Sequence, residues 1–195
     1  MNLDPNGGYS TALALSNAVG LRPFLTLALT ALAVHLHWLH PSTTYAWMGE
    51  QNVCIVLGVL AVLEFLGDKI PAVDHALHAV HFATKPIAAV LVSGGALAST
   101  DPNAAAWATM AGGVLNSLGI HGLVATTRAA STSFTVGAAN PFVSLFEDVL
   151  AVAAVALAAF LPFVGAVIAV LAIILAAVTL PRIVAALRRR RAGAA

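Results

Sequence analysis

The chain has 195 residues, of which 60% are hydrophobic and only 9% charged, with a formal net charge of +1 and a mean hydropathy of +0.93. Soluble domains carry roughly 25% charged residues, so this composition excludes a protein with a water-facing surface all round. The single cysteine, Cys54, excludes an intrachain disulfide and a cysteine-based metal site.

The apolar segments predict an all-α, polytopic transmembrane helical bundle of about six spans, because a span needs about 20 apolar residues to cross the hydrocarbon core. The first span is expected near residues 23–40, and a short interfacial helix over residues 11–20 can precede it. The second span is expected near residues 51–66 and the third near residues 86–100. A glycine, two charges and a proline in residues 67–71 end the second span.

Residues 72–84 have an amphipathic pattern, with apolar side chains at helical spacing and polar ones elsewhere around the turn. Thirteen residues give only about 20 Å of helix, too little to cross the hydrocarbon. The sequence therefore predicts a separate short helix at the cytoplasmic interface, or a re-entrant one folded against the bundle.

Three further spans are expected near residues 104–125, 141–161 and 163–180. Asn140 and Pro141 are typical of a helix start. The hydroxyl-rich residues 126–140 between the fourth and fifth spans are open to two interpretations, a re-entrant pathway lined by hydroxyls or a cytoplasmic loop. No linker divides the chain, so a single membrane domain is predicted over residues 1–195.

All lysines and arginines fall on one side of the six-span arrangement, including the run at residues 188–191. The positive-inside rule then predicts a multi-pass protein of the cell membrane with both termini in the cytoplasm. The basic run next to a final span is explained by topology and anionic lipid, so no nucleic-acid partner is predicted.

Ionisable residues lie within or beside apolar segments, where an unpaired charge costs at least about 2.5 kcal/mol at a span centre. They are expected to pair or to face water. Glu64 and Glu147 have apolar neighbours on both sides, so at least one of them is predicted to lie within ion-pair reach of a basic residue. The candidates for a solute or ion pathway are Arg22, Glu64, Asp68, Lys69, Asp74, Lys85, Thr127, Arg128, Asn140, Ser144, Glu147 and Asp148.

Histidines at three- and four-residue spacing share a helix face and suit a metal ion, which gives Asp74, His75, His78 and His81 as weak metal ligands. The same spacing also makes a plain polar stripe, which is the preferred interpretation. No nucleotide-binding or hydrolase motif is present, so neither an enzyme nor a cofactor is predicted. A membrane-embedded hydrolase that uses Asp74 and the histidines is the minor alternative.

The middle of the chain resembles the bacterial membrane proteins grouped as domain of unknown function 4126. The resemblance rests on residues 64–74 (Glu64 to Asp74, through Asp68, Lys69 and Pro71), on Lys85-Pro86 where the family commonly has Arg-Pro, on Thr126-Thr127-Arg128, and on the spacing Asn140-Pro141, Ser144, Glu147-Asp148. The resemblance implies a multi-span membrane protein and names no substrate.

Two functional hypotheses from different classes remain. One is a small transporter or channel with a charged, cytoplasm-facing polar site between helices. The other is a non-transport accessory subunit whose charged layer fixes helix packing or holds a partner. The lipid bilayer is expected to surround the protein. Abundant alanine, with Gly94-Gly95 and Gly112-Gly113, permits either close helix packing or a homo-oligomer.

Overall fold

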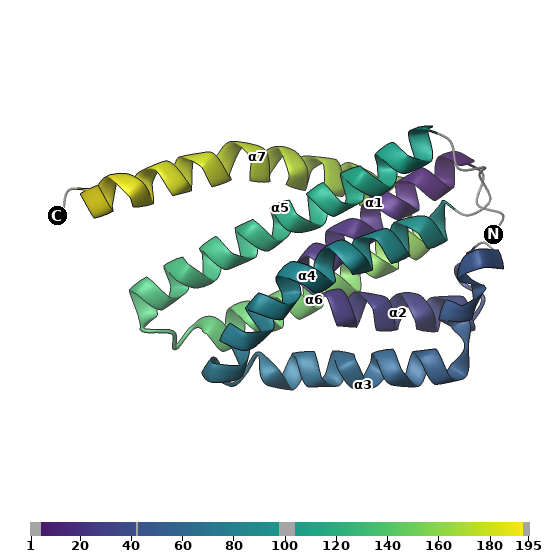
Figure 1. Ribbon diagram of the computed structural model, residues 1–195, viewed down its shortest axis with the longest axis horizontal. Helices are drawn as coiled ribbons and strands as arrows, with labels where there is room; N and C mark the ends of the chain where they lie inside the picture. Colours follow the sequence, from purple (N-terminus) through teal and green to yellow (C-terminus); the bar gives the residue numbers. More distant parts are fainter. Residues whose placement is uncertain (1–4, 42, 98–103, 193–195) are drawn as a thin grey trace.

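A computed structural model describes residues 5–41, 43–97 and 104–192 of the chain. This part is all-helical, with no β-strand, which confirms the predicted fold class. Its elements are α1 (Pro5–Leu21), α2 (Pro23–His35), the 3-10 helix η1 (Thr43–Gly49), α3 (Gln51–Gly67), α4 (Pro71–Ala96), α5 (Ala104–Thr135), α6 (Asn140–Phe160) and α7 (Pro162–Ala192). Figure 1 shows them as one elongated bundle.

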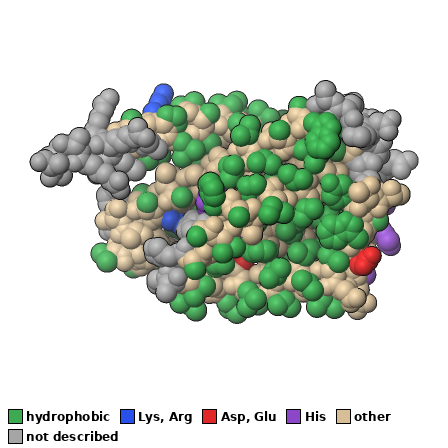
Figure 2. Space-filling model, viewed as in Figure 1, with side chains coloured by type: hydrophobic (Ala, Val, Ile, Leu, Met, Phe, Trp, Pro, Cys, Tyr) green, Lys and Arg blue, Asp and Glu red, His purple; other side chains and the backbone are tan. Residues whose placement is uncertain are grey.

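The exterior of the bundle is apolar. Hydrophobic side chains cover most of the face seen in Figure 2, and large ones such as Leu115, Phe142 and Phe146 are more than half exposed. Four helices in the described part are long and apolar enough to cross a membrane, and a fifth is reached if η1 and α3, bent by 62° at their junction, form one broken span. The protein is therefore a membrane protein, while the predicted count of six spans is not confirmed.

Helix α1 lies at the centre of the bundle, where it packs against α4, α5, α6 and α7. Ala12, Ser16, Ala18 and Val19 are at most 1% exposed. The predicted interfacial helix over residues 11–20 is therefore wrong. Small side chains let neighbouring helices approach α1 closely, and its modest hydropathy reflects contact with protein in place of lipid.

The chain folds back on itself at Arg22, which separates α1 from α2. Pro23 begins α2 and cannot continue the α1 hydrogen-bond pattern. In Figure 1 both helices run between this turn and the right-hand end of the bundle, and the turn stops short of the left-hand end reached by α5 and α6. With 13 residues, about 20 Å at 1.5 Å per residue, α2 is too short for the predicted span over residues 23–40.

The fold-back also separates the two ends of the chain. Helix α1 begins at the right-hand end of the bundle, and α7 ends at the left-hand end (Figure 1). The described part thus differs from the predicted arrangement, in which both ends lie on one side, because the predicted segments omit the path of α1 from the right-hand end to the Arg22 turn.

The predicted separate helix over residues 72–84 and the predicted third span near residues 86–100 form one continuous helix, α4, with Pro86 inside it. A proline removes one backbone donor, which a helix supported by its neighbours tolerates. The candidate span within α4 is Ala79–Ala96. His81 and Lys85 are buried, at 4% and 1% exposure, so these polar groups face protein and not an interface. Residues 98–100 lie outside the described residues.

The hydroxyl-rich stretch after the predicted fourth span is helical to Thr135, so for residues 126–135 neither a loop nor a re-entrant pathway is correct. Hydroxyls within it donate to carbonyls of the preceding turn, as Thr127 does to Leu123 at 2.9 Å and Thr135 to Ser131 at 2.7 Å. Such bonds let polar side chains remain in an apolar helix. A short turn follows, with Val136 and Gly137 at positive φ, before α6 begins.

Candidate functional site

Eight ionisable residues from five elements meet inside the bundle, and each residue is no more than 8% exposed. We name this set the charge cluster; its members are Arg22, Glu64, Asp68, His81, Lys85, Arg128, Glu147 and Asp148. Lys69 lies at its edge, with 29% of its side chain exposed. With Lys69, four basic residues face four acidic ones, and the formal sum is zero with histidine neutral.

Arg22, at the turn between α1 and α2, contacts side chains of α6 and the end of α3. It pairs with Asp68 at the end of α3, and its Nε lies 2.8 Å from Asp148 Oδ1. Its Nη2 lies 3.4 Å from Glu147 Oε2 and donates to the carbonyl and hydroxyl of Ser144 at 3.1 and 2.9 Å. One guanidinium therefore joins the fold-back turn to α3 and α6.

A second guanidinium, from α5, binds the same acidic groups. Arg128 Nη2 lies 2.6 Å from Glu147 Oε2, and its Nε donates to Oε1 at 3.2 Å, which is a two-point contact. The same Nη2 lies 3.5 Å from Asp68 Oδ2. The prediction that one of the two glutamates lies within ion-pair reach of a basic residue is confirmed for Glu147.

Glu64 is held differently from Glu147. Its Oε1 lies 2.9 Å from His81 Nε2, and its Oε2 accepts a hydrogen bond from the Leu25 backbone N–H at 3.0 Å. Among the described side chains, no lysine or arginine nitrogen lies within ion-pair distance of Glu64. A carboxylate and an imidazole, both able to gain or lose a proton, therefore form this pair.

Lys85 lies one turn after His81 on α4 and is 1% exposed. Its Nζ donates to the Gly20 carbonyl at 2.8 Å and lies 2.8 Å from His121 Nδ1. Burial favours direct pairing of a charged amine with an anion. No carboxylate among the described side chains lies within ion-pair distance of Lys85, and its direct contacts are the Gly20 carbonyl and the His121 ring.

A cavity of about 10 Å³ lies within the charge cluster, large enough for about one water molecule. Arg22, Asp68, His81, Lys85, Arg128 and Glu147 line it. Arg128 and Glu147 each lie seven residues from the α5–α6 turn, which places them about 10 Å inside that end of the bundle at 1.5 Å per residue. Both belong to candidate membrane spans.

The remaining predicted site residues lie apart from the cluster or at its edge. Lys69 Nζ contacts Ser144 Oγ at 2.5 Å and Asp148 Oδ2 at 3.4 Å. Thr127 is exposed, and Asn140 donates to Thr132 Oγ1 at 3.0 Å at the protein surface. The side chains of Asp74, His75 and His78 lie outside the described part, and no metal-binding group of three His, Cys, Asp or Glu occurs among the side chains within it.

Two histidines belong to the site although the sequence did not select them for it. The sequence pattern offers His81 only as a weak metal ligand and gives no role to His121. His121 lies in the predicted fourth span, so the rule that selected Glu64, an ionisable residue between apolar neighbours, also applies to it. His81 was assigned to an interfacial polar stripe, and only the continuous α4 turns it inward.

A family model described as Domain of unknown function (DUF4126) matches residues 10–182. No curated protein and no solved structure gives a match. The matched range contains every member of the charge cluster, together with the fold-back turn at Arg22. The chain therefore belongs to the DUF4126 family of domains of unknown function.

Proposed function

We propose that the protein is a small transporter or channel of the cell membrane whose substrate site is the charge cluster. The observation that carries this proposal is the burial of eight ionisable residues, six of which line a water-sized cavity at the Arg22 turn. Charges inside a membrane protein are costly, and they commonly mark pathways for ions or polar solutes. Helices broken at membrane depth provide such sites in many transporters, because helix ends offer unpaired backbone groups to a ligand.

A specific observation also supports the accessory-subunit alternative. Arg22 pairs with Asp68, Glu147 and Asp148, Arg128 pairs with Asp68 and Glu147, and the cavity holds only about one water. A layer of mutually satisfied ion pairs can serve only to fix helix positions. For transport, these pairs must separate when a solute enters.

Substitution of Glu147 by glutamine separates the two functions. The amide keeps the side-chain shape but removes the charge that Arg22 and Arg128 share. In a transporter, we expect solute flux to fall to the level of protein-free liposomes while the protein stays folded. The measurement is light scattering of osmotically shrunken proteoliposomes, which reswell as a solute enters, with the sodium and potassium salts of chloride, acetate and phosphate as probes.

The accessory function predicts a different outcome for the same variant. Its thermal stability in detergent should fall, while reswelling rates are unchanged because no pathway is involved. Thr109→Val is the matched control, since Thr109 bonds only within its own helix, to Ala105 at 2.9 Å. If Glu147→Gln reswells at the wild-type rate with every probe, the transport proposal is wrong.

We further propose that the left-hand end of the bundle in Figure 1 is cytoplasmic. Lys69, Arg182 and the basic run at residues 188–191 belong to the parts of the chain that lead to that end, whereas the connections at the other end contain no lysine or arginine. A reporter after Ala195 should read inside, and reporters after His40 and Asp101 outside.

Because α1 begins at the end opposite to that of α7, a reporter fused ahead of Pro5 should also read outside. Each site is tested with two reporters, one active only outside the membrane and one active only inside it, so that one of the two should give a signal at each site. An external C-terminal reporter would invert the whole arrangement, and an internal one ahead of Pro5 would contradict the fold-back of α1.

A further inference from the structure

We propose that the ion moved through this site, or coupled to its solute, is the proton. It reaches Glu64 from the outer end along Thr30 and Thr26 of α2, and the Glu64–His81 pair carries it. This inference rests on the proposed function and adds to it the chemical class of one transported species. Three observations lead to it: the chemistry of the pair, the state of the two threonine hydroxyls, and the cavity at the outer end of α2.

The Glu64–His81 pair differs from the rest of the charge cluster, because neither side chain carries a permanent charge. Glu64 Oε1 and His81 Nε2 are 2.9 Å apart, but neither atom makes a hydrogen bond in the described part, so a proton passes between them after the imidazole ring turns toward the carboxylate. Carboxylates and imidazoles are the side chains that most often exchange protons in proteins. The Leu25 N–H bond to Oε2 holds the carboxylate in place during the exchange.

The groups facing this pair come from every helix around it. Helix α2 offers the Leu25 N–H and the Phe24 ring, 6.3 Å from the His81 ring, and η1 has no charged residue. Helix α4 adds Lys85, and beyond it lie Arg22, Asp68, Arg128 and Glu147, which line the adjoining cavity. Paired charges thus surround the carrier on its inner side, and apolar and hydroxyl groups lie on its outer side.

Thr26 and Thr30 follow each other by one turn on the buried face of α2, at 0% and 4% exposure. Neither hydroxyl oxygen has a hydrogen-bond partner in the described part. Thr84 on α4 is likewise without a partner, whereas Thr109, Thr127 and Thr179 donate to the carbonyl four residues earlier at 2.7 to 2.9 Å. Buried hydroxyls that make no such bond are costly unless water or an ion meets them.

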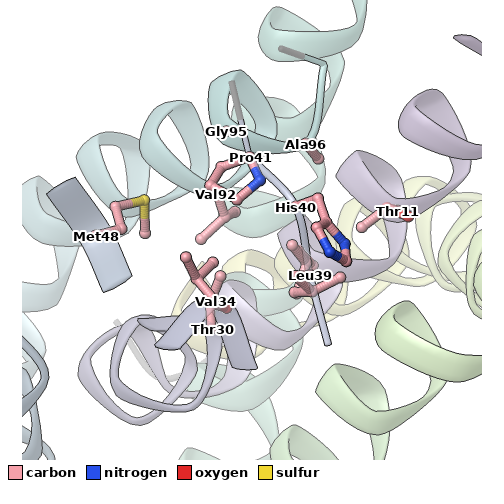
Figure 3. Close-up of a pocket in the computed structure, with 11 residues that line it drawn as sticks. Thr11, Thr30, Val34, Leu39, His40, Pro41, Met48, Val92, Gly95 and Ala96 are labelled. Atoms are coloured by element: carbon pink, nitrogen blue, oxygen red, sulfur yellow. The ribbon is translucent and has the colours of Figure 1, made fainter. Parts of the chain in front are cut away.

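Thr30 also lines a cavity of about 20 Å³ at the outer end of α2, with the volume of one or two waters and an apolar accessible wall. Figure 3 shows Thr30 among its lining residues together with Thr11 and His40. A larger cavity of about 460 Å³ at the same end is lined by residues that include His35, His40 and Glu50. Thr30 therefore lies between the outer cavities and Thr26, the residue that follows Leu25.

The proton balance of the pathway is simple. One proton from outer water adds to the Glu64 carboxylate, and the O–H proton then passes to His81 Nε2, which restores the carboxylate and leaves an imidazolium. The imidazolium loses one proton to water in the inner cavity, which His81 lines together with Asp68 and Glu147. One proton enters and one leaves, with no oxidant or further reactant.

The test is proton flux into phosphatidylethanolamine–phosphatidylglycerol liposomes that contain the purified protein and a pH-sensitive dye. Valinomycin and a potassium gradient drive protons inward. We expect the wild type to acidify the interior faster than protein-free liposomes, and Glu64→Gln to show no flux above that background. In the double variant Thr26→Val and Thr30→Val, the proton flux should fall about tenfold, which corresponds to the loss of roughly one hydrogen bond.

Valine matches threonine in shape, and the two hydroxyls make no bond in the described part, so the double variant is expected to fold normally. Thermal unfolding in detergent checks this, and Thr109→Val is the matched control with wild-type flux. A purely structural role of α2 predicts unchanged flux in the double variant, which would overturn the inference. Wild-type flux equal to that of empty liposomes would overturn it as well.

A second readout does not depend on activity. In a Cys54→Ala background, Thr30→Cys should react in intact cells with a charged, membrane-impermeant thiol reagent added outside. Ala31→Cys should not react, because Ala31 is 0% exposed and does not line the outer cavity. Solute reswelling is recorded on the same liposomes. Reswelling without proton flux would contradict this inference but not the transport proposal. The absence of reswelling and of proton flux would contradict the inference and the transport proposal alike.

Discussion

Replacing Arg22 by methionine is expected to lower the free energy of unfolding by about 3–5 kcal/mol, the cost of leaving buried charges without their partner. Arg22 is 1% exposed and contacts three acidic residues, Asp68, Glu147 and Asp148. Methionine has a similar length and fits an apolar interior, so the loss would come from charge and not from volume. The measurement is thermal unfolding in detergent together with the yield of folded protein.

The matched control is Arg182→Met, because Arg182 is an exposed arginine on α7 and its loss should leave stability nearly unchanged. A double-mutant cycle gives a second check. Adding Asp68→Asn to Arg22→Met removes an uncompensated carboxylate, so the double variant should be more stable than the sum of the single effects indicates. Full stability of Arg22→Met would mean that the turn is held by packing alone.

Replacing Gly20 by alanine is the other substitution with a large expected effect. A Cβ at this position would lie 2.5 Å from Ile120 Cβ and 3.0 Å from the Ser117 carbonyl oxygen of α5. Both atoms are fixed by the α5 backbone, so α1 must move away, at a cost of about 1–3 kcal/mol. Gly20 also accepts the Lys85 hydrogen bond and lies two residues before Arg22, so the charge cluster is displaced with it.

Gly112→Ala on α5 provides the comparison, because a Cβ at that position meets no atom within 4 Å. Alanine also forms helix better than glycine by up to about 1 kcal/mol, so this variant should be neutral or slightly more stable. Thermal unfolding of the two variants side by side is the measurement. Equal stability of Gly20→Ala and Gly112→Ala would show that α1 and α5 do not approach closely at Gly20.

The amino-acid sequence by itself determined the class of the protein and most members of the charge cluster. Apolar composition leaves a membrane bundle as the fold, because a soluble surface needs many more charges. Arg22, Glu64, Arg128 and Glu147 could be identified because an ionisable residue between apolar neighbours must find a partner inside a membrane. The sequence also predicted the starts of α3 and α6 correctly, at Gln51 and next to Pro141.

Only the tertiary structure decided where α1 lies, how α4 continues and which partners the charges take. Hydropathy measures how well a segment tolerates an apolar environment, and lipid and the protein interior are both apolar, so it cannot distinguish a central helix from a lipid-facing one. For the same reason a stripe of polar residues on α4 has the same pattern whether it faces water or the buried charges of α3, α5 and α6. Leu25 and Glu64 are separated by 39 positions in the sequence, and Thr11 and Ala158 by 147. Such residues meet only when the helices pack.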